Sequence, residues 1–304
     1  MVIMQSFDRR NFLRQSIIIG SGLVAGPSVF AFGPRPNSRF SGVQVGAITY
    51  SFRSLPVTPD DIIRYCQQSG LSALELKGDT AEPFAGAPSG NLLREWRETV
   101  GMEQFVALRK KFRKAGISIY AYKPSALGEK NSNGEIEHAM KAGKALGATS
   151  VTVELPKDPA HSKRLADIAA KHRIYIGYHA HMQATDTAWD EALAQSPWNT
   201  LNLDCGHYIA AGGQNTAASL LALLEAKHDR ISSLHLKDRR LKQNGAANVE
   251  WGKGDTPLRE ILQLMKEKKY TFPASIELEY PIPAGSNAVL EVTKCLAYAK
   301  EALS

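Results

Sequence analysis

The sequence predicts an α/β protein, and three observations together indicate a closed barrel of eight strand–helix units. From residue 44 onward, short β-branched apolar runs alternate with amphipathic helical stretches. Eight such units of about 30 residues follow one another, which is the pattern of a (β/α)8 TIM barrel. The length of 304 residues suits one barrel of about 250 residues and an N-terminal extension. A doubly wound open sheet is the second interpretation, but no glycine-rich phosphate loop follows the first strand.

The eight predicted strands are mostly apolar until their last residues, as expected of parallel strands that are buried on both faces. They span residues 44–52, 73–77, 117–123, 150–155, 174–181, 200–205, 231–237 and 273–280. The predicted helices span residues 60–70, 103–116, 133–147, 159–172, 186–194, 216–227, 257–269 and 287–303. Gly70, Gly116 and Gly147 stand where three of these helices end, since glycine is a helix stop signal. Asn133 is the predicted N-cap of its helix.

One connection is too long for an ordinary strand-to-helix loop. Residues 80–101 contain two prolines and three glycines, and they predict an irregular segment. Because this segment follows the end of a strand, we expect it to form part of the rim of an active site.

The first residues have the features of an export signal. Arg9 and Arg10 precede Phe12-Leu13-Arg14, an uncharged stretch follows, and Ala31 offers a small residue for cleavage. This resembles a twin-arginine signal, so we expect a signal peptide over residues 1–31, a linker over 32–41, a barrel over 42–304 and a periplasmic or otherwise exported protein. The alternative is an uncleaved anchor helix. The stretch is too short and too rich in glycine for a confident membrane span, so we expect no stable span after cleavage.

The charge does not favour a nucleic-acid partner. The chain carries +7, and removal of residues 1–31 lowers this value to +5. The densest basic run, residues 110–114, lies in a predicted helix and is typical of a solvated face. Cys66, Cys205 and Cys295 are widely spaced and odd in number, and this pattern indicates neither a zinc ribbon nor a disulfide framework.

Ionisable residues collect at the carboxyl ends of the predicted strands, where TIM barrels carry out their chemistry. These residues are Glu75, Lys77, Lys123, Glu154, His179, His181, Asp204, His207, His235, Lys237, Glu277 and Glu279. Carboxylates that converge on one mouth repel each other unless a cation holds them. Carboxylate and imidazole ligands together suit Mn²⁺, Mg²⁺, Co²⁺ or Zn²⁺. Asp204 and His235 are the strongest candidates because each interrupts an apolar strand. Glu75 is equally well explained as an interior ion-pair partner of Lys77 or Lys123.

Several short motifs at these strand ends resemble one family. They are YHAH at 178–181, LDCGH at 203–207, HLKD at 235–238, WGKGD at 251–255 and IELEYP at 276–281. Each is weak alone, but in this order they resemble the xylose isomerase-like TIM barrels, which are known as sugar phosphate isomerases/epimerases.

The resemblance implies one divalent metal ion, often Mn²⁺, held by a Glu, an Asp, a His and a second Glu. Asp204 and His235 match the family's Asp and His, and Glu279 matches the final Glu better than Glu277 does. The first Glu is missing from its usual strand, so Glu154, His181 or His179 must supply that ligand, and Glu154 is favoured. The family's substrate-contacting histidine matches His207.

The resemblance also implies the reaction class, a sugar isomerase or epimerase that abstracts a proton next to a carbonyl through a metal-stabilised enediolate. His181, His207 and Lys123 are the candidate acids and bases. His179, Trp251 and Tyr50 are the candidate substrate-binding residues, although plain core packing explains the aromatic rings equally well. Export favours a non-phosphorylated sugar or sugar derivative. Family members often form dimers or tetramers, so a homo-oligomer is expected from the resemblance alone.

Three other functions remain open. A 3-keto-glycoside lyase or hydratase of the same family would use the same site for β-elimination. A non-catalytic sugar-binding barrel would bind a sugar without exchanging carbon-bound hydrogen. A metal-dependent endonuclease of related barrel type would need more histidine ligands and a basic rim, and export disfavours it.

Overall fold

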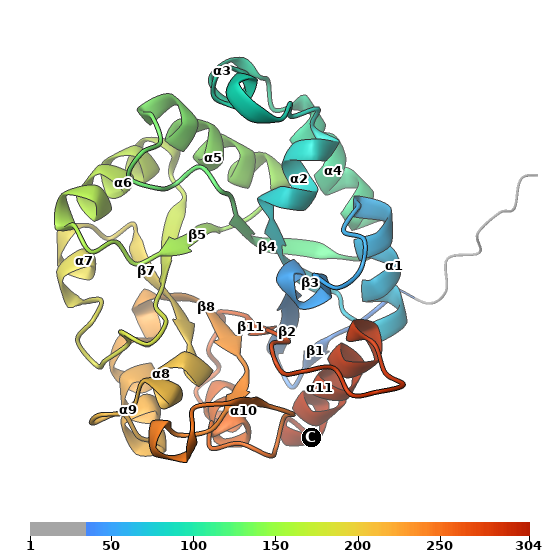
Figure 1. Ribbon diagram of the computed structural model, residues 1–304, viewed down its shortest axis with the longest axis vertical. Helices are drawn as coiled ribbons and strands as arrows, with labels where there is room; N and C mark the ends of the chain where they lie inside the picture. The colour runs from blue at the N-terminus through green and yellow to red at the C-terminus, as the bar shows by residue number, and fades with distance from the viewer. Residues whose placement is uncertain (1–34) are drawn as a thin grey trace, which may run out of the picture. The chain divides into compact units, whose positions relative to one another are not determined.

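A computed structural model describes residues 35–304 (Figure 1). The predicted signal peptide and the first part of the predicted linker lie outside the described residues. Within the described part, a ring of helices surrounds a central sheet. The short strand β1, Arg39–Phe40, falls in the predicted linker and pairs antiparallel with β2, Val43–Ile48.

The central sheet is a closed barrel of eight parallel strands, which confirms the predicted (β/α)8 TIM fold. The strands that follow β2 are β3 (Ala73–Lys77), β4 (Ser118–Lys123), β5 (Ser150–Glu154), β6 (Tyr175–His179), β7 (Asn199–Asp204), β8 (Ile231–Leu236) and β11 (Ala274–Ile276). Each strand pairs with the next, and β11 closes the barrel by pairing with β2. The carboxyl ends of all eight strands therefore lie at one mouth.

The helices that cover the barrel match the prediction closely. They are α1 (Pro59–Ser69), α4 (Glu103–Lys114), α5 (Asn133–Leu146), α6 (Pro159–His172), α7 (Asp190–Gln195), α9 (Ala217–Lys227), α10 (Leu258–Glu267) and α11 (Ala288–Ala302). Gly70 and Gly147 end their helices in the left-handed conformation, with φ of 83° and 85°. The predicted N-cap was wrong by one residue, because Ser132 rather than Asn133 caps α5 and forms a capping box with Glu135.

Two predicted strands end four residues earlier than expected. After β2, residues Thr49–Phe52 form a 3-10 helix, and Ser51 anchors it to the last strand region, because its Oγ donates to the carbonyl of Ile276 and accepts from the amide of Leu278. The last strand is only three residues long. The extended chain beyond it still pairs with β8, because the Glu277 amide donates to the Leu236 carbonyl at 3.0 Å.

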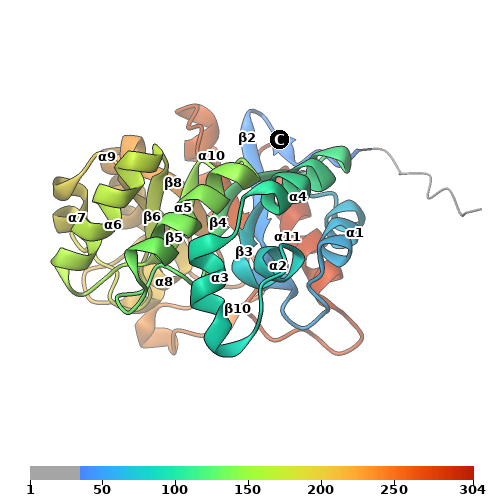
Figure 2. The same cartoon turned by 90° about the horizontal axis from the view of Figure 1, so that it is seen from above.

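The segment 80–101 is not irregular, so that prediction was wrong. It contains two helices, α2 (Gly78–Phe84) and α3 (Leu93–Thr99), with a short 3-10 turn between them at Gly90–Leu92. A further helix, α8 (Cys205–Ala211), begins directly after β7. The small strands β9 (Asp238–Arg239) and β10 (Asn248–Val249) form a hairpin after β8. Figure 2 shows α3, α8 and β10 toward the same end of the barrel.

The core lies between the barrel and its helices and is formed by aliphatic and aromatic side chains such as Phe105, Tyr122 and Trp189. Cys66, Cys205 and Cys295 are buried within it as free thiols. Among residues 35–304, no helix combines the length and the apolar character that a membrane crossing requires.

Candidate active site

A cluster of ionisable side chains fills the mouth of the barrel. We call Glu75, Asp204, His235, Lys237, Glu277 and Glu279 the mouth cluster. They come from β3, β7, β8 and the chain after β11, and all except Glu279 are buried. The pairing of β7 with β8 sets Asp204 directly beside His235. The strand-end prediction therefore placed these residues correctly at one mouth.

His235 lies between two carboxylates. Its Nε2 is 2.7 Å from Glu75 Oε2, and its Nδ1 is 2.9 Å from Glu277 Oε2. Burial alone would lower the pKa of His235, but the charges of Glu277 and Glu75 raise it to about 10. His235 is therefore an imidazolium at neutral pH and donates from both ring nitrogens.

Lys237 is the second cation of the mouth cluster. Its Nζ lies 3.0 Å from Asp204 Oδ2 and 2.7 Å from one oxygen each of Glu277 and Glu279. Burial opposes the charge, but Asp204 and the two glutamates raise the pKa of Lys237 above its usual range. The ammonium thus holds together three carboxylates that would otherwise repel one another.

The two oxygens of Asp204 have different roles. Oδ1 accepts a 2.7 Å hydrogen bond from the His207 amide and caps α8. Oδ2 is buried and accepts no well-aligned hydrogen bond. Its nearest cation is the Lys237 ammonium, at 3.0 Å. Burial raises the pKa of Asp204 above its usual range. A buried acceptor left in this state indicates an incomplete site.

Three imidazole nitrogens surround that oxygen at longer range. His179 Nε2 and His207 Nε2 lie 3.8 Å from Asp204 Oδ2, and His235 Nδ1 lies 3.9 Å from it. Two ligands that each lie about 2.1 Å from one ion can be at most about 4.2 Å apart. The donor atoms of His179, Asp204 and His235 lie within 4.8 Å of one another, so they must move slightly closer together to share one ion. Their carboxylate and imidazole chemistry suits a divalent cation.

The other two predicted metal ligands have lysine partners. Glu154 contacts Lys123 Nζ at 3.1 Å and His181 Nδ1 at 3.0 Å, and Glu279 contacts Lys237. Glu277, rather than Glu279, lies against His235. Glu154 must separate from Lys123, and Glu279 from Lys237, before either carboxylate can bind an ion.

The Glu154–His181 pair is the accessible part of the site. The side chains of Glu154 and His181 are 47% and 49% exposed. The hydrogen bond to Glu154 raises the pKa of His181, whereas burial lowers it by a smaller amount. His181 can therefore carry a proton at the mouth near neutral pH. Lys123, the third predicted acid or base, is held in charged form because Glu154 and Glu75 outweigh its burial and raise its pKa.

His207 and His179 are held neutral. Burial and the charge of Lys237 lower the pKa of His207 to about 3. Its Nε2 lies 3.1 Å from Lys237 Nζ, and its Nδ1 faces Arg239. Burial also lowers the pKa of His179, whose Nδ1 contacts Asn202 Oδ1 at 3.0 Å. His179 lies inside the barrel with the ligating atoms rather than on the rim.

The two aromatic candidates lie in different surroundings. Tyr50 is in the 3-10 turn after β2, where the Arg53 guanidinium and the Lys77 ammonium lie over its ring at 4.4 and 5.1 Å. Trp251 lies in the loop after β10 and packs edge-on against Tyr298 of α11, at 5.7 Å between ring centroids.

Three of the sequence motifs contact one another, through hydrogen bonds in one case and through close packing in the other. The carboxylate of Asp238 accepts hydrogen bonds from the amides of Gly252, Gly254 and Thr256, so HLKD holds the WGKGD loop in place. Gly206 allows α8 to lie against Lys237, because a Cβ at this position would clash with the Lys237 side chain. The glycine of LDCGH thus helps to position both His207 and Lys237.

The sequence motifs assigned no role to Lys237, and they favoured Glu279 over Glu277 as the last metal ligand. Lys237 shares strand parity with His235, and this alternation could have placed it on the inner face. Glu75, left open between two roles, is an interior partner of His235 and of Thr152, whose hydroxyl donates to it at 2.6 Å.

With this geometry in hand, comparison with known proteins identifies the class. The chain belongs to the xylose isomerase-like TIM barrel family, whose model matches residues 63–296. No functionally curated protein matches the chain.

Several solved structures share the fold at low sequence identity. The probable 3-DHS dehydratase AsbF of Bacillus anthracis is 16% identical, with a TM-score of 0.62 over 84% of this chain and 98% of that one. A sugar phosphate isomerase/epimerase of Parabacteroides distasonis is 20% identical, with a TM-score of 0.56 over 84% and 93%. A xylose isomerase-like protein of Mycobacterium smegmatis, in complex with magnesium, is 14% identical, with a TM-score of 0.59 over 86% and 96%.

Proposed function

We propose that this protein is a divalent-metal-dependent sugar isomerase or epimerase that acts on a non-phosphorylated sugar or sugar derivative. The observation that carries the proposal is the buried Asp204 Oδ2, which accepts no well-aligned hydrogen bond, faces the Lys237 ammonium at 3.0 Å and has three imidazole nitrogens within 3.9 Å. Family membership and a fold shared with a sugar phosphate isomerase/epimerase support it.

In this proposal, Asp204 and His235 hold the ion and His179 is within reach of it. His235 would bind through Nδ1 after this nitrogen loses its proton and separates from Glu277, while Nε2 still donates to Glu75. Glu154 and Glu279 join the ligand set once they separate from Lys123 and Lys237. When bound, the ion supplies Lewis-acid charge that acidifies hydrogen on the carbon next to a carbonyl. Mn²⁺ is the proposed metal, because mixed carboxylate and imidazole ligands suit it.

The protein's own groups then move the proton. His181 is open to solvent and bonded to Glu154, so this pair can accept a proton at the mouth and return it. As long as Glu154 has not turned to the ion, Lys123 donates to it and keeps that carboxylate charged. His207, neutral and beside Arg239, is placed to accept a hydrogen bond from a substrate hydroxyl whenever its ring turns from its lysine partner.

Hydrogen exchange tests the proposal. The purified protein is incubated with Mn²⁺ in D₂O and a panel of aldoses, ketoses and 3-keto glycosides. Protein and metal are then removed before proton NMR, because Mn²⁺ broadens the lines. Deuterium at one carbon, together with a new isomer or epimer, is the expected result. If no sugar in the panel takes up deuterium or forms a product, the proposal is overturned and a sugar-binding barrel is favoured.

A second candidate is a 3-keto-glycoside lyase or hydratase. The observation that favours it is the raised pKa of His181 at an exposed position, because elimination needs an acid that protonates a leaving group. In the same assay, loss of the aglycone with no isomer formed would identify this reaction.

We further propose export by the twin-arginine route, from the Arg9-Arg10 sequence. Replacing both arginines with lysine should keep the protein in the cytoplasm, as measured by cell fractionation. Unchanged export of this variant would exclude the route.

A further inference from the structure

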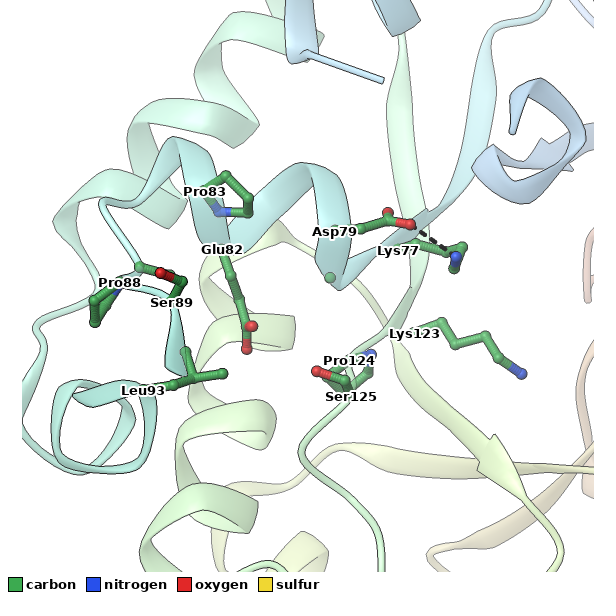
Figure 3. A pocket seen from close by; sticks show the side chains of 12 residues that line it. Lys77, Asp79, Glu82, Pro83, Pro88, Ser89, Leu93, Lys123, Pro124 and Ser125 are labelled. Carbon is green, nitrogen blue, oxygen red and sulfur yellow. Dashed lines mark hydrogen bonds and ion pairs between the residues drawn. The ribbon is translucent and has the colours of Figure 1, made fainter. Parts of the chain in front are cut away.

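Beside the mouth cluster lies a pocket of about 500 Å³ that we call the α2–α3 pocket. Its walls come from α2, the turn before α3, the first residue of α3 and the chain after β4 (Figure 3). The volume is within the range of small-molecule pockets. The apolar part of the wall consists of Pro83, Ala87, Pro88, Leu93 and Pro124.

Every charged group in the wall already has a partner. Lys77 pairs with Asp79 at 2.8 Å, and both line the pocket. Glu82 pairs with the buried guanidinium of Arg97 at 2.8 Å, and Lys123 pairs with Glu154 at 3.1 Å. Glu75 also offsets the charge of Lys123, so this lysine keeps a nearby carboxylate even when Glu154 turns to an ion. With its charges compensated in this way, the pocket suits a neutral, apolar group.

Lys123 links the pocket to the candidate active site. Lys77 and Lys123 are paired residues at the ends of β3 and β4, and their side chains extend to the same side in Figure 3. Lys123 lines the pocket and also donates to Glu154, which in turn contacts His181. A molecule bound at His181 could therefore extend past Lys123 into the pocket.

We propose that the α2–α3 pocket is a subsite for the neutral, apolar substituent of a larger substrate, such as the aryl or alkyl group of a glycoside. This inference rests on the proposed sugar chemistry at the barrel mouth and extends it, because a free monosaccharide would leave the subsite empty. Ser89 and Ser125 also line the pocket, and Ser125 already accepts from Arg97. The proline, alanine and leucine side chains offer most of the apolar contact area, which favours an aryl or alkyl group over a second sugar ring.

Two adjacent leucines give a matched pair of variants. Leu93 lines the pocket, whereas Leu92, the residue before it, is 62% exposed and does not belong to the lining. Leu93→Trp should fill the pocket, and Leu92→Trp adds the same bulk outside it. Ala87→Phe fills the pocket from another wall and serves if Leu93→Trp does not fold, as judged by circular dichroism.

The first experiment needs no turnover. Binding of 4-fluorophenol, a small aryl probe, is measured by ¹⁹F NMR on the full chain. We expect a dissociation constant on the order of millimolar for the unaltered protein and for Leu92→Trp, and at least about tenfold weaker binding for the two filled variants. Failure of the probe to bind, or equal binding by the filled variants, would overturn the proposal.

A second experiment separates this proposal from the proposed function. Phenyl and methyl 3-keto-glucosides are compared in the hydrogen-exchange or aglycone-release assay. The KM of the phenyl compound should be at least about tenfold lower, and Leu93→Trp should remove this difference. Equal KM values in an active protein would refute the subsite alone. Probe binding without turnover of these glucosides or of any sugar in the panel would refute the proposed function and leave the subsite intact.

Discussion

Two buried ionic clusters lie within this barrel, and they differ in how completely their charges are satisfied. In the first, which we call the Arg97 cluster, Arg97 donates twice to Glu82 and once each to Glu135 and Ser125, at 2.7–3.1 Å. Glu135 also accepts from the Ser132 amide. In the mouth cluster, by contrast, one lysine faces three carboxylates and Asp204 Oδ2 lacks a hydrogen bond.

Burial of charge does not by itself indicate function. The Arg97 cluster ties α2, α3 and α5 together, and its bidentate geometry leaves no ligand position open. The mouth cluster combines a carboxylate oxygen that has an ammonium neighbour but no aligned hydrogen bond with imidazoles and competing carboxylates. Strongly perturbed and incompletely paired groups of this kind are typical of active sites.

The largest effect that we expect comes from breaking the Arg97 cluster. Arg97→Met leaves Glu82 and Glu135 buried without their cation, so the free energy of unfolding should fall by about 3–5 kcal/mol. Urea unfolding at pH 7 measures this loss. Arg94→Met is the control, because Arg94 is exposed and lies 3.6 Å from Glu135, and it should cost less than about 1 kcal/mol. Equal losses in the two variants would contradict a structural role for Arg97.

The corresponding change in the mouth cluster should act on metal binding instead. Asp204→Asn keeps the N-cap of α8, since an amide oxygen can still accept from the His207 amide, but it removes the carboxylate charge. Calorimetric titration should show Mn²⁺ affinity reduced by about 100-fold or more, with little loss of stability. The control is Glu82→Gln in the Arg97 cluster, which should lose stability and keep its metal affinity. Full metal occupancy in Asp204→Asn would show that the site assignment is wrong.

The barrel and its strand-end residues could be predicted because both follow from local patterns. Period-two alternation and apolar runs locate strands, and parallel strands bring their carboxyl ends together. Asp204 and His235 were predicted to meet and lie directly beside each other. The partners of Lys237 could not be predicted, since the contact of its ammonium with three carboxylates depends on the register between strands and on rotamers.

The α2–α3 segment was mispredicted because tertiary contacts, rather than local helix propensity, stabilise its two helices. Pro83 lies inside α2 and glycines flank α3, so local propensity disfavours helices of only seven residues each. The ion pairs of Arg97 with Glu82 and Glu135 hold these helices against α5 and outweigh that propensity. Ion pairs between residues far apart in the sequence cannot be predicted from a local sequence pattern.

His138 is a buried ionisable residue beside the Arg97 cluster, and both of its ring nitrogens lack hydrogen bonds. Trp96 and Phe105 pack edge-on against its ring. Burial and the charge of Arg97 lower its pKa to about 4. The unfolded chain has a histidine pKa of about 6.5, so it binds more protons than the native state between these values.

The pH dependence of unfolding follows from this difference. Stability from His138 is present above about pH 6.5 and is lost as the pH falls toward 4, by about 2 kcal/mol between pH 7 and pH 5. Urea unfolding at both values should show a smaller loss in His138→Leu than in the unaltered protein. Identical pH slopes would mean that His138 is not buried as a neutral ring.

The smallest effect that we expect tests the competition inside the mouth cluster. Lys237 Nζ lies 3.0 Å from the Asp204 oxygen that we assign to the metal, so its charge opposes a divalent ion at that site. Lys237→Met removes this repulsion, and the affinity for Mn²⁺ should rise by about tenfold. Without metal the variant should be less stable, because Glu277 and Glu279 lose their shared cation.

These two effects predict that added Mn²⁺ raises the Tm of Lys237→Met by more than that of the unaltered protein. Lys242→Met, which removes a lysine outside the mouth cluster, controls for the change in net charge. Weaker metal binding in Lys237→Met would show that this lysine supports the ion rather than competing with it. The mouth cluster would then resemble the Arg97 cluster, with a lysine as a permanent structural cation.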